Sequence, residues 1–339
     1  MNRNNGIDLF KLIGAFFVMC LHTSYGSLNQ EYVDNLRLFS RWAIPFFFIA
    51  TGFFLGNKFE NKSLDFKRIQ KNVIALISIL IVSSIIYIPI DFITGNFYIK
   101  ITNILTGTYF HLWFIGSLLT GYIFIWYLYY IKMNKLLPII SIFIIILALF
   151  TDSYDQFINK NIGFDMFRFL LSVPFMYIGI IISKKRINIR RYKFLIGLVF
   201  IGLIIQYAEA ELFLNLFKYE KYTHQFLIGT IVIAIALSLF LVSSNLNIRD
   251  NIFSQWGKEH SLFIYLYHPI IYLITWTVLE RLIPNYYDSI KIFSPLIGFA
   301  IILTFSIVLN RFFPKIYNIL NGKFINVDKK RKNNPIQVY

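Results

Sequence analysis

The chain has 339 residues, of which 57% are hydrophobic and 15% charged. Soluble domains are about 45–50% apolar and about 25% charged, so this composition indicates a membrane protein. The net charge of +16 is compatible with a nucleic-acid partner. The basic residues, however, lie in short loops between apolar runs, and we expect no nucleic-acid binding. The single cysteine, Cys20, excludes an intramolecular disulfide and a multi-cysteine metal site.

Apolar runs of bilayer length follow one another along the chain. A bilayer needs about 20 residues, or fewer where the helix is short, and about ten runs meet this requirement. They cover residues 7–25, 38–56, 73–94, 111–131, 136–151, 166–183, 194–212, 224–243, 260–279 and 292–312. No small-x-small cleavage site follows the first run, so we expect a retained anchor rather than a signal peptide. The sequence therefore predicts an all-α integral membrane protein, a single bundle of about ten transmembrane helices in the cell membrane.

Basic residues concentrate in alternate loops, above all in 58–71, in 184–193 and after residue 311. The positive-inside rule then places both termini in the cytoplasm. We expect one transmembrane domain over 1–313 and a basic cytoplasmic tail over 314–339. The tail ends in a stretch from Lys329 that is predicted to be disordered and to touch anionic lipid.

The first run carries ionisable residues inside an apolar segment. Asp8, Lys11 and His22 fall at i, i+3 and i+14 of a helix, on one face. Asp8 and His22 would lie roughly 21 Å apart along it. Ionisable groups within a bilayer usually face a cavity or a partner, so we predict a path along this face from the cytoplasm toward the outer leaflet. In the alternative, Asp8 and Lys11 lie at the membrane interface and His22 is a hydrogen-bonded packing residue.

Three arginines, Arg37, Arg41 and Arg168, lie at predicted outer helix ends. Arg41 opens the second span at a depth similar to that of His22, so the two side chains are predicted to share a cavity. A guanidinium suits two-point recognition of oxygens and would hold an oxyanion or phosphate there; snorkelling to the headgroups is the alternative. Arg168 has the same position in the sixth span. His111 and Trp113 open the fourth span, where an interfacial aromatic belt is the alternative.

The ninth run has a polar face. Ser261, Tyr265, His268 and Tyr272 fall at i, i+4, i+7 and i+11, so they share one side of a helix. This favours a role facing the bundle. The five histidines are spread over separate segments, and none forms a pair with zinc spacing. We expect no metal site.

Taken in chain order, these residues resemble the acyltransferase-3 family of multi-pass membrane acyltransferases. The matching motifs are Ile7-Asp8-Leu9-Phe10-Lys11 leading to His22, Arg41 leading to Pro45-Phe-Phe-Phe and Thr51-Gly52-Phe, His111-Leu-Trp113-Phe, Arg168 leading to Pro174-Phe175 and Gly179, and Tyr265 with His268-Pro269. Lys11 stands where an arginine is common, and Thr51 where a serine is common. We expect no fused hydrolase-like or racemase-like domain, although some relatives carry one.

The resemblance implies transfer of an acyl group, usually acetyl, from cytoplasmic acyl-CoA to a hydroxyl of an extracytoplasmic or lipid-linked glycan. Acyl-CoA would be a substrate and not a permanently bound cofactor. Such chemistry needs a general base for the hydroxyl and donors for the oxyanion, and we predict His22 as the base and Arg41 as the oxyanion-binding group. The predicted substrate-binding residues are Asp8, Lys11, His111, Trp113, Arg168, Tyr265 and His268. The expected partners are membrane lipid, acyl-CoA and the glycan acceptor.

A transporter or flippase for a small polar solute or a lipid-linked sugar is the alternative, because it also needs intramembrane charges and a path. Transporters often show inverted repeats, and this sequence shows none. A structural membrane subunit would leave the face with Asp8, Lys11 and His22 without a purpose.

Reporter fusions test the predicted topology. Fusions placed within 58–71, within 184–193 and in the tail should all report the cytoplasm, because these segments carry the concentrated positive charge. An extracellular readout from 184–193 would overturn the arrangement.

Overall fold

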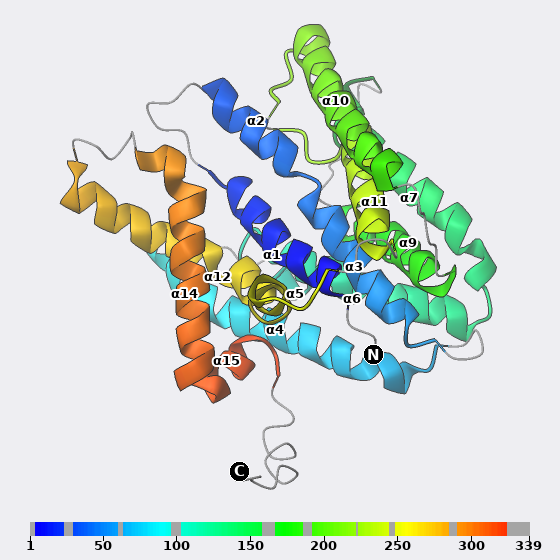
Figure 1. Cartoon of the computed structure of the whole chain (residues 1–339), viewed down its shortest axis with the longest axis horizontal. Coiled ribbons are helices and arrows are strands. Elements are labelled where there is room, and N and C mark those ends of the chain that lie inside the picture. The colour runs from blue at the N-terminus through cyan, green and yellow to red at the C-terminus, as the bar shows by residue number, and fades with distance from the viewer. Residues whose placement is uncertain are drawn as a thin grey trace, which may run out of the picture.

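The computed structural model describes residues 4–23, 30–59, 64–95, 103–157, 167–185, 192–221, 223–243, 248–284 and 290–323. Within these ranges the chain is helical and has no β-strand. The prediction of an all-α protein is therefore confirmed. The helices pack side by side into one bundle, with α1 and α3 at its centre (Figure 1). Helices α12, α14 and α15 lie on one side of this pair, and α7, α9, α10 and α11 lie on the other.

The α-helices are α1 (Asn5–Cys20), α2 (Gln30–Ser40), α3 (Ala43–Gly56), α4 (Phe66–Ile93), α5 (Asn103–Thr106), α6 (Trp113–Tyr130), α7 (Leu137–Thr151), α9 (Ser172–Lys185), α10 (Tyr192–Phe217), α11 (Ile228–Val242), α12 (Ile252–Leu282), α14 (Ser294–Phe312) and α15 (Pro314–Leu320). Short 3₁₀ turns include η3 (Arg168–Leu171), directly before α9. A helix covers most of each predicted apolar run.

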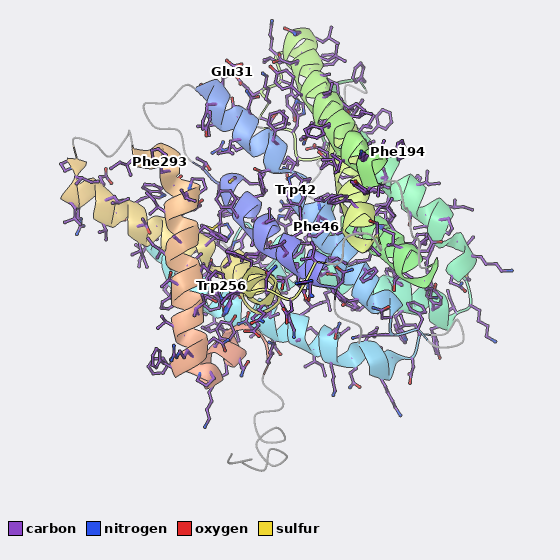
Figure 2. All side chains as sticks on the ribbon, viewed as in Figure 1. Glu31, Trp42, Phe46, Phe194, Trp256 and Phe293 are labelled. Atoms are coloured by element: carbon purple, nitrogen blue, oxygen red, sulfur yellow. The ribbon has the colours of Figure 1, made fainter. Side chains whose placement is uncertain are left out.

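Six helical stretches of the described chain are long and apolar enough to cross a membrane. They are Gln30–Gly56, Ile69–Ile93, Asn134–Thr151, Tyr192–Phe217, Ile252–Leu282 and Ser294–Phe312. The outer surface of the bundle agrees with this, because Phe194 and Phe293 point away from it while Trp42 and Phe46 lie buried at its centre (Figure 2). The chain is thus a helical membrane protein. The count of ten spans and the cytoplasmic termini stay predictions.

The second predicted run, 38–56, is not one helix. It is divided between α2 and α3, and Arg41 and Trp42 form the turn that separates them. The physical reason is Pro45, which has no amide hydrogen to donate to the carbonyl four residues earlier, that of Arg41. The break places Arg41 at a helix junction instead of on a helix face.

Glycines allow the central helices to cross closely. A Cβ atom on Gly52 of α3 would lie 2.0 Å from the Met176 carbonyl oxygen of α9, and one on Gly179 would lie 2.1 Å from the Ile49 oxygen. Where α12 crosses α1, a Cβ on Gly257 would lie 1.8 Å from the carbonyl oxygen of Asp8. Small residues of this kind let backbones of membrane helices touch. The close crossing of α3 and α9 therefore requires a residue without a Cβ atom at Gly52 and at Gly179.

The described part of the predicted tail is helical. The Tyr317 hydroxyl of α15 donates a hydrogen bond to the Glu259 carbonyl at 2.6 Å, and the Tyr267 hydroxyl of α12 donates to the Leu320 carbonyl at 2.9 Å. Residues 314–320 therefore pack against α12. Residues 324–339, with the stretch from Lys329, lie outside the described residues, and the boundary at residue 313 stays a prediction.

Gly52→Ala should destabilise the protein, because the added methyl group meets backbone atoms of α9 and cannot be accommodated by a side-chain rotation. Overpacking of this kind costs about 1–3 kcal/mol. Gly197→Ala in α10 is the matched control, since its Cβ would meet nothing within 4 Å. Thermal unfolding in detergent should show a lower melting temperature for the first variant and no loss for the second. Equal melting temperatures would contradict the close α3–α9 crossing.

Candidate active site

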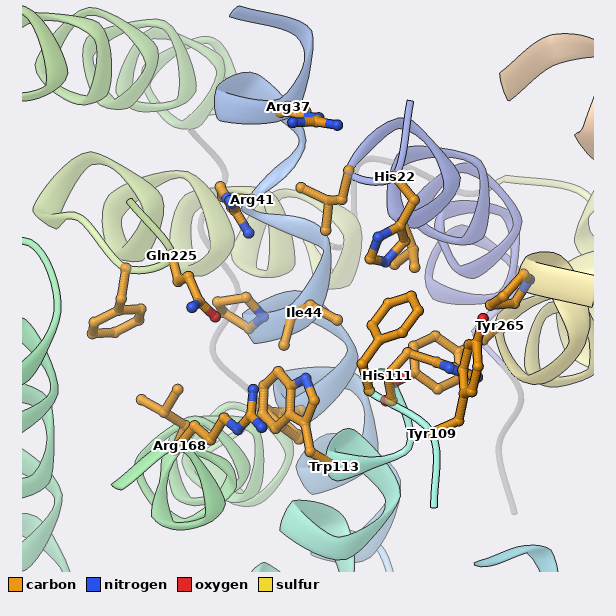
Figure 3. A pocket seen from close by; sticks show the side chains of 18 of the residues that line it. His22, Arg37, Arg41, Ile44, Tyr109, His111, Trp113, Arg168, Gln225 and Tyr265 are labelled. Atoms are coloured by element: carbon orange, nitrogen blue, oxygen red, sulfur yellow. The ribbon is translucent and has the colours of Figure 1, made fainter. Parts of the chain in front are cut away.

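A cavity of about 960 Å³ lies at the end of the bundle where α1 stops and α3 begins. Ligand pockets usually measure about 300–1,000 Å³, so this one has room for a large ligand. Its walls come from the end of α1, the α2–α3 break, the segment before α6, the start of α9, the segment before α11 and α12. In Figure 3, Arg41 and Gln225 lie on one side of the cavity and His22, His111 and Tyr265 on the other.

The cavity gathers most of the predicted site residues. Those that line it are His22, Arg41, His111, Trp113, Arg168 and Tyr265. His268 does not line the cavity but packs directly against the ring of His22. The prediction that His22 and Arg41 share one cavity is thus realised in the structure. Their chemical roles stay predictions.

Asp8 and Lys11 lie at the other end of α1, away from this cavity. Lys11 Nζ donates a hydrogen bond to Asp8 Oδ1 at 2.8 Å and sits over the ring of Phe54, 4.5 Å from its centroid. The carboxylate of Asp8 is almost fully buried, while Lys11 is partly exposed. The predicted polar face therefore has its two ends in different surroundings, and a path between them stays a prediction.

The imidazole of His22 lies in the cavity wall just beyond the last turn of α1. Its ring stacks on that of His268, with centroids 5.2 Å apart and planes 26° apart, and meets the edge of Phe110 at 5.0 Å. The ring nitrogens of His22 form no hydrogen bond with any described residue. Ring nitrogens of His111, His260 and His268 are hydrogen-bonded within the protein. Those of His224 have no partner, but His224 is fully buried and does not line the cavity. His22 is therefore not the hydrogen-bonded packing residue of the alternative interpretation, and its nitrogens can bind a ligand.

Three arginines line the cavity, whereas no carboxylate among the described residues does. Arg37 donates hydrogen bonds from Nε and Nη2 to the Thr23 carbonyl, at 3.0 and 2.5 Å. Arg168 stacks on Trp113, with its guanidinium carbon 5.2 Å from the ring centroid. Arg37 and Arg41 both act electrostatically on His22. Guanidinium groups in such a setting bind oxyanions with two parallel hydrogen bonds.

Asp152 interacts electrostatically with Arg41 from behind the cavity wall. Its Oδ2 accepts hydrogen bonds from the backbone of Gln225 at 2.8 Å, from the backbone of Phe226 at 2.6 Å and from the Ser153 hydroxyl at 2.8 Å. The carboxylate thereby holds the segment before α11, which contributes Gln225 to the cavity. Asp152 fixes the side of the cavity that contains Arg41.

Sequence analysis did not assign Arg37, Tyr109, Asp152 or Gln225 to the site. The one signal for Asp152 was its place at the end of an apolar run, where an acidic residue is costly without partners. Its partners lie about seventy residues further along the chain, at Gln225 and Phe226. Sequence spacing cannot reveal such a contact. No group of three or more His, Cys, Asp or Glu side chains arranged to hold a metal occurs among the described residues.

The fold and the cavity define a helical membrane protein with a polar pocket rich in arginine, which suits a polar ligand. Comparison with known proteins makes this specific. The family described as an acyltransferase domain matches residues 4–311, nearly the whole chain. The protein therefore belongs to this acyltransferase family, and the resemblance seen in the motifs is confirmed.

Curated relatives carry other names. The chain is 26% identical over 343 residues to an amino-acid racemase of Enterococcus faecalis, which covers 91% of this chain and 45% of that protein. It is 25% identical over 135 residues to a serine/alanine racemase of Enterococcus gallinarum, which covers 35% of this chain and 19% of that protein. The chain thus spans less than half the length of these relatives. No solved structure matches the chain.

Proposed function

We propose that this acyltransferase moves an acyl group, typically acetyl, from cytoplasmic acyl-CoA to a hydroxyl of an extracytoplasmic or lipid-linked glycan at the cell membrane. One observation carries the proposal: a histidine whose ring nitrogens are free faces the same cavity as Arg41. A general base and a donor for the oxyanion are the two groups that acyl transfer to a hydroxyl requires. The family match supplies the reaction class.

In the proposed reaction, a ring nitrogen of His22 takes the proton of the acceptor hydroxyl while the hydroxyl oxygen attacks the thioester carbon. The carbonyl oxygen becomes an oxyanion, which the guanidinium of Arg41 stabilises through charge and two hydrogen bonds. The carbon–sulfur bond then breaks, and the departing CoA thiolate takes the proton back from the His22 imidazolium. The products are the ester and the free thiol, and His22 returns to its neutral form.

The lining of the cavity, where we place the acceptor, suits a molecule rich in hydroxyl groups. Tyr109, Trp113 and Tyr272 offer flat apolar rings together with polar tips. Gln225 adds both a donor and an acceptor. A sugar ring, with apolar C–H faces and hydroxyls around its edge, fits this combination.

On the donor side, we place the phosphates of CoA near Lys11 at the other end of α1. A lysine binds phosphate as a point charge, and Lys11 is accessible enough to do so. Lys11 and His22 are separated by about 17 Å along the helix axis. The extended phosphopantetheine arm of CoA is the part of the donor that would cover this distance and carry the thioester to His22.

A second candidate is the passage of a small polar solute, such as an amino acid, through the same cavity. The names of the racemase relatives favour it. The fate of a labelled donor separates the two functions. Label from acetyl-CoA that appears in glycan supports acyl transfer, whereas vesicles that accumulate a free amino acid without any such transfer support transport.

His22→Ala should abolish acyl transfer without changing the amount of protein in the membrane. Loss of a general base costs about 10²–10⁴-fold in rate. Arg41→Lys should lose about 10²-fold despite its charge, because the planar two-point contact is lost. The measurement is transfer of radiolabelled acetyl groups from acetyl-CoA in membranes with expression matched by immunoblot.

His260→Gln is the control for these variants. This histidine lies on α12, bonds to Ser306 and Tyr317 and does not line the cavity. Its transfer rate should stay close to that of the wild type. If His22→Ala retained more than about a tenth of the wild-type rate, it would lie outside the range expected for a general base, and the proposed role of His22 would be wrong.

A further inference from the structure

Helix α12 is continuous but contains a proline, Pro269, beside the candidate active site. Proline has no amide hydrogen, so the carbonyl four residues earlier, that of Tyr265, has no helical donor. The side chain of the preceding residue fills this gap: His268 Nδ1 lies 2.8 Å from the Tyr265 oxygen. Because a carbonyl can only accept, the hydrogen in this bond must belong to Nδ1. The imidazole of His268 thus replaces the amide donor that Pro269 lacks.

This bond decides which nitrogen of His268 carries the lone pair. With the proton at Nδ1, the lone pair lies at Nε2, which is buried and has no hydrogen-bond partner among the described residues. His268 is fully buried and does not line the cavity. It therefore cannot reach a ligand in the cavity or compete with His22 for the proton of an acceptor hydroxyl.

The same stretch of α12 is hydrogen-bonded to α4 and to the segment before α6. The next carbonyl, that of Leu266, accepts hydrogen bonds from the Tyr87 hydroxyl at 2.7 Å and from His111 Nε2 at 3.0 Å. The Tyr265 hydroxyl in turn donates to the carbonyl of His111. The backbone around Pro269 is thus anchored from two directions. The ring of His268, bonded to this backbone, has a fixed orientation.

The ring of His268 is in direct contact with that of His22. His22 has no hydrogen bond to set the orientation of its own imidazole, and the rings in contact with it are those of His268 and Phe110. The His268 ring lies nearly parallel to that of His22, with centroids 5.2 Å apart, and so supports the His22 ring along its face, while Phe110 lies at a steep angle to it at 5.0 Å. A base must present its nitrogen in the correct direction, and a small misplacement in an active site can cost about 10²-fold in rate.

We propose that His268 is a positioning residue, which the carbonyl freed by Pro269 holds in place so that its ring orients the imidazole of His22 toward the cavity. This inference rests on the proposed acyl transfer with His22 as the base. It assigns the His268-Pro269 pair a joint role, in which the proline leaves the Tyr265 carbonyl without a helical donor and the histidine supplies the donor and the ring face.

The test compares Pro269→Ala, His268→Ala and the double variant. Alanine at 269 returns an amide hydrogen that competes with His268 for the Tyr265 carbonyl, while it favours the helix. We expect an unchanged or higher melting temperature, a kcat lowered about 10²-fold and an unchanged KM for acetyl-CoA. The double variant should be no slower than His268→Ala alone, because the two residues act as one unit. Pro89→Ala, at an exposed proline within α4, is the matched control and should keep the wild-type kcat.

A second readout does not depend on transfer. The rate at which diethyl pyrocarbonate modifies His22, followed by peptide mass spectrometry, should change in Pro269→Ala and His268→Ala and stay constant in Pro89→Ala. If the wild type transfers no acetyl group, the proposed function fails, and the labelling rates still test the orientation of His22. Wild-type kcat and wild-type labelling in Pro269→Ala would overturn the inference. So would independent effects of the two substitutions that multiply in the double variant.

Discussion

The structure depends on the close parallel contact between α1 and α12. At one end Gly257 allows the backbone of α12 to touch the carbonyl of Asp8, and at the other the Tyr272 hydroxyl donates a hydrogen bond to the Met19 carbonyl at 3.0 Å. These two contacts set the register of the helices over the whole length of α1. Because the register is set, His22 at the end of α1 lies against His268, next to the proline inside α12. The cavity lies beside this contact.

A buried polar group in a membrane protein is costly unless it has a partner or a function. Most of the polar residues in and behind the cavity wall have such a partner. Asp152 has three donors for one carboxylate oxygen, Arg37 has the carbonyl of Thr23, and Arg168 has the ring of Trp113. His22 differs, since its nitrogens have no partner in the described protein. His224 also has ring nitrogens without a partner, but it is fully buried and does not line the cavity. Among the described histidines, His22 combines free nitrogens with a place in the cavity lining, which supports its assignment to chemistry rather than to packing.

Much of this arrangement could be predicted from the sequence. The antiparallel order of the first two apolar runs placed His22 and Arg41 at similar depth, and the structure brings both to one cavity. Other features depend on contacts between distant segments. Asp152 reaches the backbone at Gln225, and His268 reaches His22, so neither role follows from spacing on one helix. The helical spacing of Asp8, Lys11 and His22 also could not show that Lys11 lies away from the cavity, because residues on one face of a helix can have different surroundings.

The most direct test of the account is an experimental structure with a ketone analogue of acetyl-CoA, in which a methylene group replaces the thioester sulfur and blocks transfer. The account predicts that the ketone oxygen lies within hydrogen-bond distance, about 2.7–3.1 Å, of the Arg41 guanidinium, with the ring of His22 beside the ketone carbon. It also predicts the CoA phosphates at the Lys11 end of α1. Density for the ketone outside the cavity, or remote from both His22 and Arg41, would contradict it.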